Sequence, residues 1–177
     1  AQYIPIDEKH PLQAQSPYAA SKIAADKLAE SYYLSFGLPI ATLRPFNTFG
    51  PRQSLRAIIP TIVSQAITDK KIRLGNTQPR RDFLFVQDTV RAFIQLGKCE
   101  GAVGKVVNIG TGTDISIEAL VMKILSLMGK RREIEVEAQR IRPEKSEVKQ
   151  LLSDNRLAQK LFKWAPRYTL EEGLQET

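Results

Sequence analysis

Tyr18 and Lys22 form a pair of side chains suited to acid–base catalysis. They are four positions apart in the segment YAASK, so in a helix they share one face. A free phenol has a pKa of about 10. For a tyrosine to act as a base near neutrality, its phenolate must therefore be stabilised by about 4 kcal/mol relative to the phenol. A neighbouring ammonium and a cationic cofactor ring would supply that help in a partly desolvated cleft. The alternative is that the lysine stem simply packs over the ring.

The segment that carries this pair is predicted to be a long helix followed by a strand. Ser16 suits the N-cap, Pro17 suits the first helical position, and Gly37 is a typical stop. Residues 39–46 (PIATLRPF) have the character of a short buried strand, and a loop is predicted at 47–51. Helical and strand patterns continue to alternate downstream, which favours an α/β fold with parallel strands.

Further elements are predicted along the rest of the chain. Met122, Leu125 and Met128 are expected in the core of a helix that Ser116 caps and Gly129 ends. The other predicted elements are helices at 57–69 and 88–96, strands at 72–75, 82–86, 105–110 and 133–138, and short helices capped by Asp154 and by Thr169, whose T-x-x-E pattern is a capping box.

The composition excludes several classes of protein. The chain has 177 residues, of which 42% are apolar and 25% charged, as is ordinary for a globular protein of one domain or slightly more. Apolar runs are too short for a membrane span, and the start has no pattern of a secretory signal. A single cysteine, Cys99, and a single histidine, His10, leave no Cys/His metal site. We therefore expect a cytosolic protein without a metal or membrane partner.

The net charge of +7 raises the question of nucleic acid. The cations lie in separate short clusters, at 80–81, 130–132 and 140–142, and aromatic residues are not interleaved with them. A ligand that carries a diphosphate needs only a few such arginines. We therefore expect no nucleic-acid partner.

Several longer motifs resemble one protein family. The string SPYAASK and the later LRPFNTFGPR are similar to those of the extended short-chain dehydrogenases/reductases, and within them of the nucleotide-sugar epimerases and dehydratases. The resemblance continues through PRRDFLFVQDTVRAFI, KVVNIGTGTDISI and RPEKSEVKQLLSDNRLA, in the family's order. It covers nearly the whole chain.

This resemblance implies roles for individual residues. Tyr18 matches the catalytic base that takes a proton from the sugar 4-hydroxyl as hydride leaves C4 for NAD. Lys22 matches the residue that holds the nicotinamide ribose and lowers the tyrosine pKa. Pro45 and Phe46 match positions where the backbone passes the nicotinamide end of the cofactor.

The resemblance also implies a site for a nucleotide-diphosphate sugar. Asn47 and Arg81 match residues that contact the substrate diphosphate, for which the forked guanidinium is well suited. Arg142 and Glu147 resemble a nucleotide-phosphate arginine and a ribose-binding glutamate. Asn47 could instead merely cap a turn. Three other arginines are expected to be solvated or to flank a helix: Arg52, Arg56 and Arg80.

Gly110 and Gly112 superficially suggest a dinucleotide loop, because they follow a strand and precede a helix. Ile115 stands where the third glycine would be needed, and the acidic residue that should end a following strand is missing. In the family the true glycine-rich loop lies upstream of residue 1. The chain begins without Met and ends within a capped helix. We therefore expect a fragment that does not turn over substrate by itself.

The expected architecture is part of a Rossmann-type parallel sheet with a smaller α/β substrate-binding domain. Residues 1–53 would belong to the NAD-binding domain and most of 54–177 to the substrate domain, with 105–112 returning to the Rossmann sheet. The expected activity is that of an NAD-dependent nucleotide-sugar 4,6-dehydratase, in a homodimer. The alternatives are a 4-epimerase, a UDP-glucuronate decarboxylase and a module that only binds nucleotide sugars. The sequence does not fix the base or the sugar, nor NAD over NADP.

Overall fold

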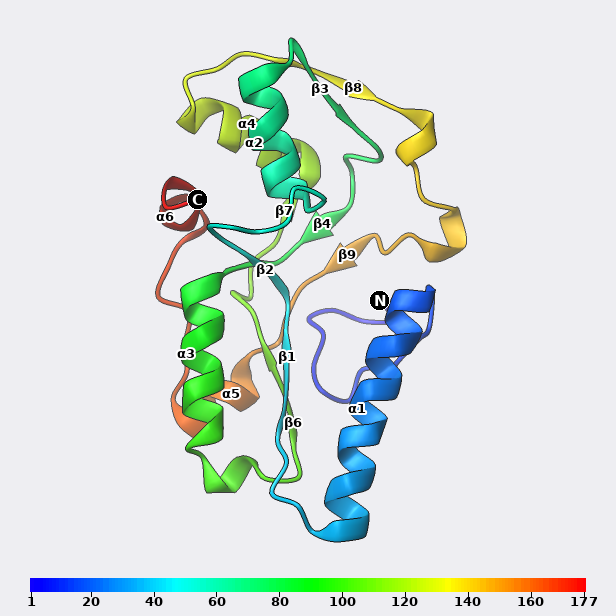
Figure 1. Ribbon diagram of the computed structural model, residues 1–177, viewed down its shortest axis with the longest axis vertical. Helices are drawn as coiled ribbons and strands as arrows, with labels where there is room; N and C mark the ends of the chain where they lie inside the picture. The colour runs from blue at the N-terminus through cyan, green and yellow to red at the C-terminus, as the bar shows by residue number, and fades with distance from the viewer.

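In the computed structural model, which describes residues 1–177 apart from the side chain of Glu144, the strands form four small sheets (Figure 1). Three of these sheets are parallel pairs. They join β1 (Thr42–Pro45) to β6 (Val106–Ile109), β2 (Asn47–Phe49) to β5 (Phe83–Phe85), and β3 (Lys71–Leu74) to β8 (Glu133–Val136). The predicted α/β fold with parallel strands is confirmed.

The pair β1–β6 has helices around it in the lower half of Figure 1. These are α1 (Pro17–Phe36), α3 (Val86–Gly97) and α5 (Arg156–Phe162). A hydrophobic cluster fills the space between β6, α3 and α5, and its largest member, Trp164, is fully buried. By contrast, no residue of α1 is buried.

A second hydrophobic cluster is formed by side chains of helices and strands that lie mainly in the upper half of Figure 1. Here α2 (Ile58–Thr68), α4 (Ile117–Leu127) and α6 (Leu170–Gln175) pack with β3 and β5. The buried side chains come from one face of each helix, as their helical spacing predicts. Met122 is an exception to our prediction: it is 58% exposed, because it lies on the outer face of α4, whereas Leu125 is buried.

The fourth sheet lies between these two halves and consists of very short strands. β4 (Arg80–Arg81) pairs in parallel with β9 (Gln150–Leu151) and antiparallel with β7 (Ile115–Ser116). Successive residues of a strand point to opposite sides, so the side chains of Arg80 and Arg81 diverge. From the sequence, no strand is predicted at Arg80 and Arg81, and a loop is predicted at 47–51, where β2 forms.

The helix ends follow local sequence signals. Ser16 accepts a hydrogen bond from the Ala19 N–H at the start of α1, and Gly37 ends this helix with a φ of 64°. Thr169 forms the predicted capping box of α6. The cap predicted for α5 is wrong by one residue: Asn155 is the N-cap, and Asp154 accepts instead from the N–H of the first helical residue.

The remaining regular elements are three short 3-10 helices, at Glu100–Ala102, Ala138–Arg140 and Glu144–Ser146. Within the described part of the chain, no helix combines the length and apolar character needed to cross a membrane.

Candidate active site

α1 presents Tyr18 and Lys22 on the same face, as their spacing predicts. The Lys22 ammonium lies 5.6 Å from the centroid of the Tyr18 ring, a distance typical of a cation–π contact. Tyr18 is 71% exposed. The geometry therefore brings the proposed base and its cationic partner together, and the ring stays accessible to a ligand.

An ion pair links α1 to β1. Arg44 Nε lies 2.6 Å from Asp26 Oδ2, and both side chains are about a quarter exposed, at 23% and 24%. Asp26 follows Lys22 by one helical turn. Partly buried pairs of this kind are less screened by solvent than surface pairs, so this contact helps fix how α1 is oriented on the sheet.

Tyr18 lines a cavity of about 600 Å³ between α1 and the end of β1, which we call the tyrosine cavity. Pro45, Phe46 and Asn47 lie on its wall, as does the loop that precedes α1. Lys22 does not line it. The cavity therefore brings Tyr18 together with Pro45, Phe46 and Asn47, three further residues that the sequence analysis assigns to the site.

The turn at Gly110–Gly112 does not provide the pyrophosphate end of such a site. The N–H groups of Thr111 and Gly112 already donate to the carboxylate of Asp82, at 2.8 and 3.1 Å. A phosphate would need those donors free. This agrees with our interpretation that the turn is not the cofactor loop.

A second cavity, of about 690 Å³, adjoins the first and shares Tyr18 and Asn47 with it. We call it the arginine cavity. It contains the other predicted substrate residues, Arg81, Arg142 and Glu147. With Tyr18, Pro45, Phe46 and Asn47, all predicted site residues except Lys22 therefore line one or both cavities.

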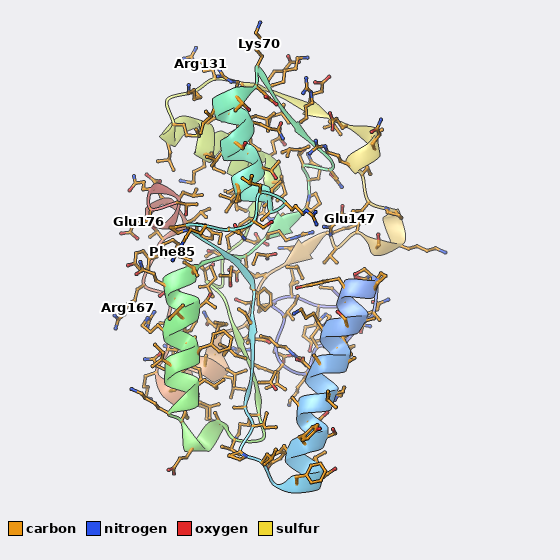
Figure 2. The ribbon with its side chains drawn as sticks, in the orientation of Figure 1. Lys70, Phe85, Arg131, Glu147, Arg167 and Glu176 are labelled. Carbon is orange, nitrogen blue, oxygen red and sulfur yellow. The ribbon has the colours of Figure 1, made fainter. Side chains whose placement is uncertain are left out.

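Arg81 is the most enclosed cation of the arginine cavity. Its Nη2 lies 3.4 Å from Glu147 Oε1, and the two side chains are 13% and 14% exposed (Glu147 is labelled in Figure 2). Burial lowers the pKa of the Arg81 guanidinium; Glu147 opposes this shift, and Arg142 adds to it. The guanidinium also donates from Nη1 to the Arg80 carbonyl oxygen at 2.9 Å, and with the long contact to Glu147 this leaves three of its five N–H donors for an anionic ligand.

Asn47 owes its position to the pairing of β2 with β5. Its side-chain Nδ2 and its backbone N both donate to the carbonyl oxygen of Asp82, at 2.9 and 3.1 Å. Asn47 lines both cavities, so this pair of hydrogen bonds fixes its side chain at their junction.

The arginine cavity also has residues that our sequence analysis missed. Arg56, which we expected to be solvated or to flank a helix, lines it, and so does Arg140. Arg80 is partly exposed and pairs with Asp114, and Arg52 lines neither cavity. The sequence could not show which of these arginines line the cavity, because all of them carry the same charge. The distinction depends on the folded position of residues 140–148, which form one wall of the cavity.

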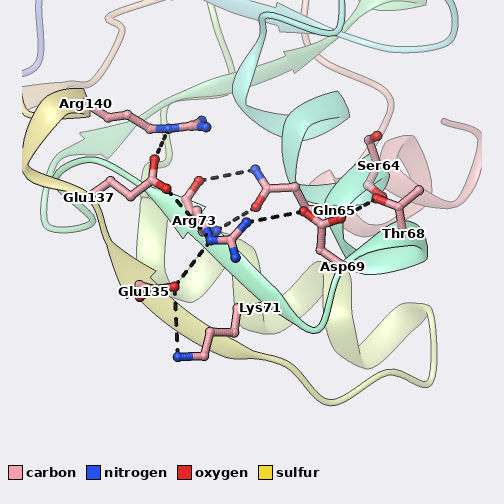
Figure 3. A network of polar contacts seen from close by, with 9 residues as sticks. All are labelled: Ser64, Gln65, Thr68, Asp69, Lys71, Arg73, Glu135, Glu137 and Arg140. Carbon is pink, nitrogen blue, oxygen red and sulfur yellow. Dashed lines mark hydrogen bonds and ion pairs between the residues drawn. The ribbon is translucent and has the colours of Figure 1, made fainter.

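Arg140 is held by a network of ion pairs between β3 and β8 (Figure 3). It contacts Glu137 at 2.5 Å, and Glu137 in turn faces Arg73, which also contacts Glu135 and Asp69. The side chains of these pairs are partly exposed, so each pair contributes little by itself, but a network restrains its members together. It therefore orders the strands that end at this cavity wall.

Comparison with known proteins places these observations in a family context. The chain matches the family model described as GDP-mannose 4,6 dehydratase over residues 1–177. It is 39% identical over 123 residues to dTDP-D-glucose 4,6-dehydratase of Dictyostelium discoideum, a match that covers 68% of the chain and 28% of that relative.

The chain is also similar to solved structures of a nucleotide-sugar dehydratase and of a nucleotide-sugar epimerase. The dTDP-glucose 4,6-dehydratase of Bacillus anthracis in complex with NAD has a TM-score of 0.90 at 33% identity, and the match covers 100% of this chain and 55% of that one. The UDP-glucuronic acid 4-epimerase of Bacillus cereus in complex with UDP-glucuronic acid and NAD has a TM-score of 0.88 at 26% identity, over 97% and 54%. The chain spans 49% to 55% of several curated relatives that it matches over nearly its whole length.

Proposed function

Because the chain belongs to the GDP-mannose 4,6-dehydratase family, within the extended short-chain dehydrogenases/reductases, we propose that it is part of an NAD-dependent nucleotide-sugar 4,6-dehydratase. Relatives in this family are nucleotide-sugar dehydratases and 4-epimerases. The observation that carries the proposal is that the tyrosine cavity and the arginine cavity share Tyr18 and Asn47. A diphosphate in the second cavity would therefore bring its sugar to the tyrosine in the first.

The arginine cavity would hold the nucleoside diphosphate. Arg81 is enclosed and has free donors, so it can bind phosphate oxygens with the two parallel bonds that a guanidinium allows. Arg142 would contact a phosphate and Glu147 a ribose hydroxyl. Asn47, held by the Asp82 carbonyl, would contact the diphosphate at the junction of the two cavities.

The tyrosine cavity would hold the sugar and the nicotinamide. NAD, when bound, would supply the acceptor for a hydride from C4 of the sugar and the donor of that hydride to C6. Tyr18 takes the proton of the C4 hydroxyl, so that C4 becomes a ketone. The Lys22 ammonium, beside the ring, stabilises the phenolate that this transfer needs and would also contact the nicotinamide ribose. Pro45 and Phe46 would position the nicotinamide end.

The 4-ketone makes the second half of the reaction possible. It acidifies the C5 hydrogen, so that a proton leaves C5 and hydroxide leaves C6, together one water. Addition of hydride at C6 and of a proton at C5 then gives a 4-keto-6-deoxy sugar. In this scheme Tyr18 and Lys22 serve the oxidation at C4.

A 4-epimerase is the second candidate. The specific observation in its favour is the match to the Bacillus cereus UDP-glucuronic acid 4-epimerase at a TM-score of 0.88. The Tyr18–Lys22 pair suits either reaction, because both begin with oxidation at C4. The family model and the Dictyostelium relative favour the dehydratase.

An isotope experiment distinguishes the two candidates. The full-length protein is incubated in D2O with NAD and UDP-, GDP- and dTDP-hexoses, and the product is examined by NMR. A 4,6-dehydratase must place one solvent deuterium at C5, because that proton is lost and regained. A 4-epimerase returns hydride to C4 and places no deuterium on carbon. A product that has inverted C4 and no carbon-bound deuterium would overturn the dehydratase proposal.

We further propose that the full-length protein is a homodimer that pairs through α1. In support, one face of this helix carries Ala20, Ala24, Leu28 and Tyr32 at four-residue spacing, and all four are exposed.

We also propose that residues 1–53 and the returning segment 105–112 belong to the NAD-binding domain. Its support is that β6 pairs with β1, while a separate hydrophobic cluster forms around α2 and α4.

A further inference from the structure

Asp82 is a fully buried carboxylate at the junction between the two halves of the chain. Its Oδ1 accepts hydrogen bonds from the N–H and the hydroxyl of Thr111, at 2.8 and 2.7 Å. Its Oδ2 accepts from the N–H of Gly112 at 3.1 Å, and from the N–H and hydroxyl of Ser153 at 3.2 and 2.6 Å. Among the described side chains, no lysine or arginine is paired with it. Its charge is therefore compensated by donors from two separate segments.

The backbone of Asp82 is tied to the candidate active site. Its carbonyl oxygen accepts both bonds from Asn47, and its N–H donates to the Leu151 carbonyl at 2.9 Å. Arg81, the most enclosed cation of the arginine cavity, is the preceding residue. Any shift of the Asp82 peptide would therefore move the two side chains proposed to bind the diphosphate.

The backbone at Gly110 packs closely against the side chains of Asp82 and Ser153. A Cβ at Gly110 would overlap the side chains of Asp82 and Ser153, so a glycine is needed there. Ser153 also forms a parallel bridge with Ile6, in the loop that leads to α1. The carboxylate thus connects the loop before Tyr18, the Gly110–Gly112 turn and the strand of Arg81.

We propose that Asp82 is a positioning residue for substrate binding: its carboxylate fixes the peptide that sets Arg81 and Asn47 at the spacing a diphosphate requires. This inference rests on the proposed function, since it assumes that the arginine cavity takes a nucleoside diphosphate. Asp82 itself is buried and lines neither cavity, so it acts only through its neighbours.

The test is an Asp82→Asn substitution in the full-length protein. The asparagine keeps the size of the side chain but replaces one carboxylate oxygen with an NH2 group, which cannot accept from backbone N–H donors. Either orientation of the amide therefore leaves backbone N–H donors without an acceptor: those of Gly112 and Ser153 if the NH2 group replaces Oδ2, or that of Thr111 if it replaces Oδ1. Binding of UDP, GDP and dTDP, and of the matching nucleosides, is measured by calorimetry together with the melting temperature.

Asp88→Asn is the matched control. Asp88 is equally buried, accepts from the backbone N–H groups of Arg167 and Tyr168, and lines neither cavity. Both variants should melt at lower temperature. Only Asp82→Asn should weaken the best-bound diphosphate at least tenfold, while affinity for its nucleoside changes less than twofold. If Asp82→Asn does not fold, Ser153→Ala removes a single donor and should weaken the diphosphate in the same selective way.

The outcomes distinguish a failure of the proposed function from a failure of the role proposed for Asp82. If wild-type protein binds none of the three diphosphates, the proposed function fails and this inference with it. If wild type binds a diphosphate and the foldable variant, Asp82→Asn or else Ser153→Ala, binds it as tightly, the inference alone is overturned. It is likewise overturned if diphosphate and nucleoside weaken equally, because that pattern indicates general destabilisation.

Discussion

Replacement of Arg81 by lysine should weaken binding of a nucleoside diphosphate by about ten- to 150-fold. Arg81 is only 13% exposed, and its single side-chain ion pair, to Glu147, is long at 3.4 Å. Lysine keeps the charge but loses the fork that makes two parallel bonds to phosphate. The loss of one charge-assisted hydrogen bond costs about 1.5–3 kcal/mol, which corresponds to this range of affinity.

The assay is calorimetric titration of the full-length protein with UDP, GDP and dTDP. Arg80→Lys is the control, because Arg80 is the neighbouring residue on β4 but pairs with Asp114 away from both cavities. It should change affinity less than twofold. Equal losses in the two variants would show that a guanidinium at either position of the strand has the same effect, and that the placement of Arg81 in the cavity does not matter. An unchanged affinity in Arg81→Lys would refute the assignment of Arg81 to the diphosphate.

Three further predictions concern catalysis, assembly and pH. Tyr18→Phe should lower kcat by about 100-fold or more with little change in KM, as loss of a general base does; steady-state kinetics that retain kcat would exclude Tyr18 as the base. Leu28→Glu should convert the dimer to a monomer in light scattering, and a persistent dimer would place the interface elsewhere. The hydrogen bond to Asp7 raises the pKa of Tyr3 to about 12. Because the folded-state pKa exceeds the unfolded value of about 10, this bond stabilises the fold at neutral pH and is lost as the pH rises from about 10 to 12. An absorbance titration should show one late tyrosine that Asp7→Asn abolishes; identical curves would contradict this.

Elements with a local signal were predictable from the sequence. Ser16, Pro17 and Gly37 bound α1 because caps and stops depend on residues within one turn of the helix end. The capping box at Thr169 is local in the same sense. The α5 cap was misplaced because Asp154 and Asn155 are both good caps and adjacent.

Elements that depend on distant partners were not predictable. β2 forms because Asn47 pairs with Phe83, and β4 because Arg80 pairs with Gln150, far along the chain. Strands of two or three residues carry no alternating pattern of their own. Met122 was misassigned for a related reason: periodicity gives an apolar stripe, but the packing of α4 decides which side chains at its margin are covered.

The residues of the candidate site likewise divide into those predictable from local sequence and those that depend on distant contacts. The Tyr18–Lys22 pair is local to one helix, so its geometry followed from spacing. The roles of Arg56 and Arg140 could not be read in this way, because their cavity exists only when residues 140–148 fold opposite α2. Asp82 was overlooked as an acidic residue in a basic segment, and its significance lies in contacts to residues 29 and 71 positions away.

The most direct test of the central claim is mass spectrometry of nucleotide sugars incubated with the full-length protein and NAD. UDP-, GDP- and dTDP-hexoses are supplied separately, and Tyr18→Phe protein serves as the inactive control. The account predicts that one of these substrates loses the mass of one water, and that the variant converts it far more slowly. A product of unchanged mass whose sugar has inverted at C4 would contradict the dehydratase and identify an epimerase instead.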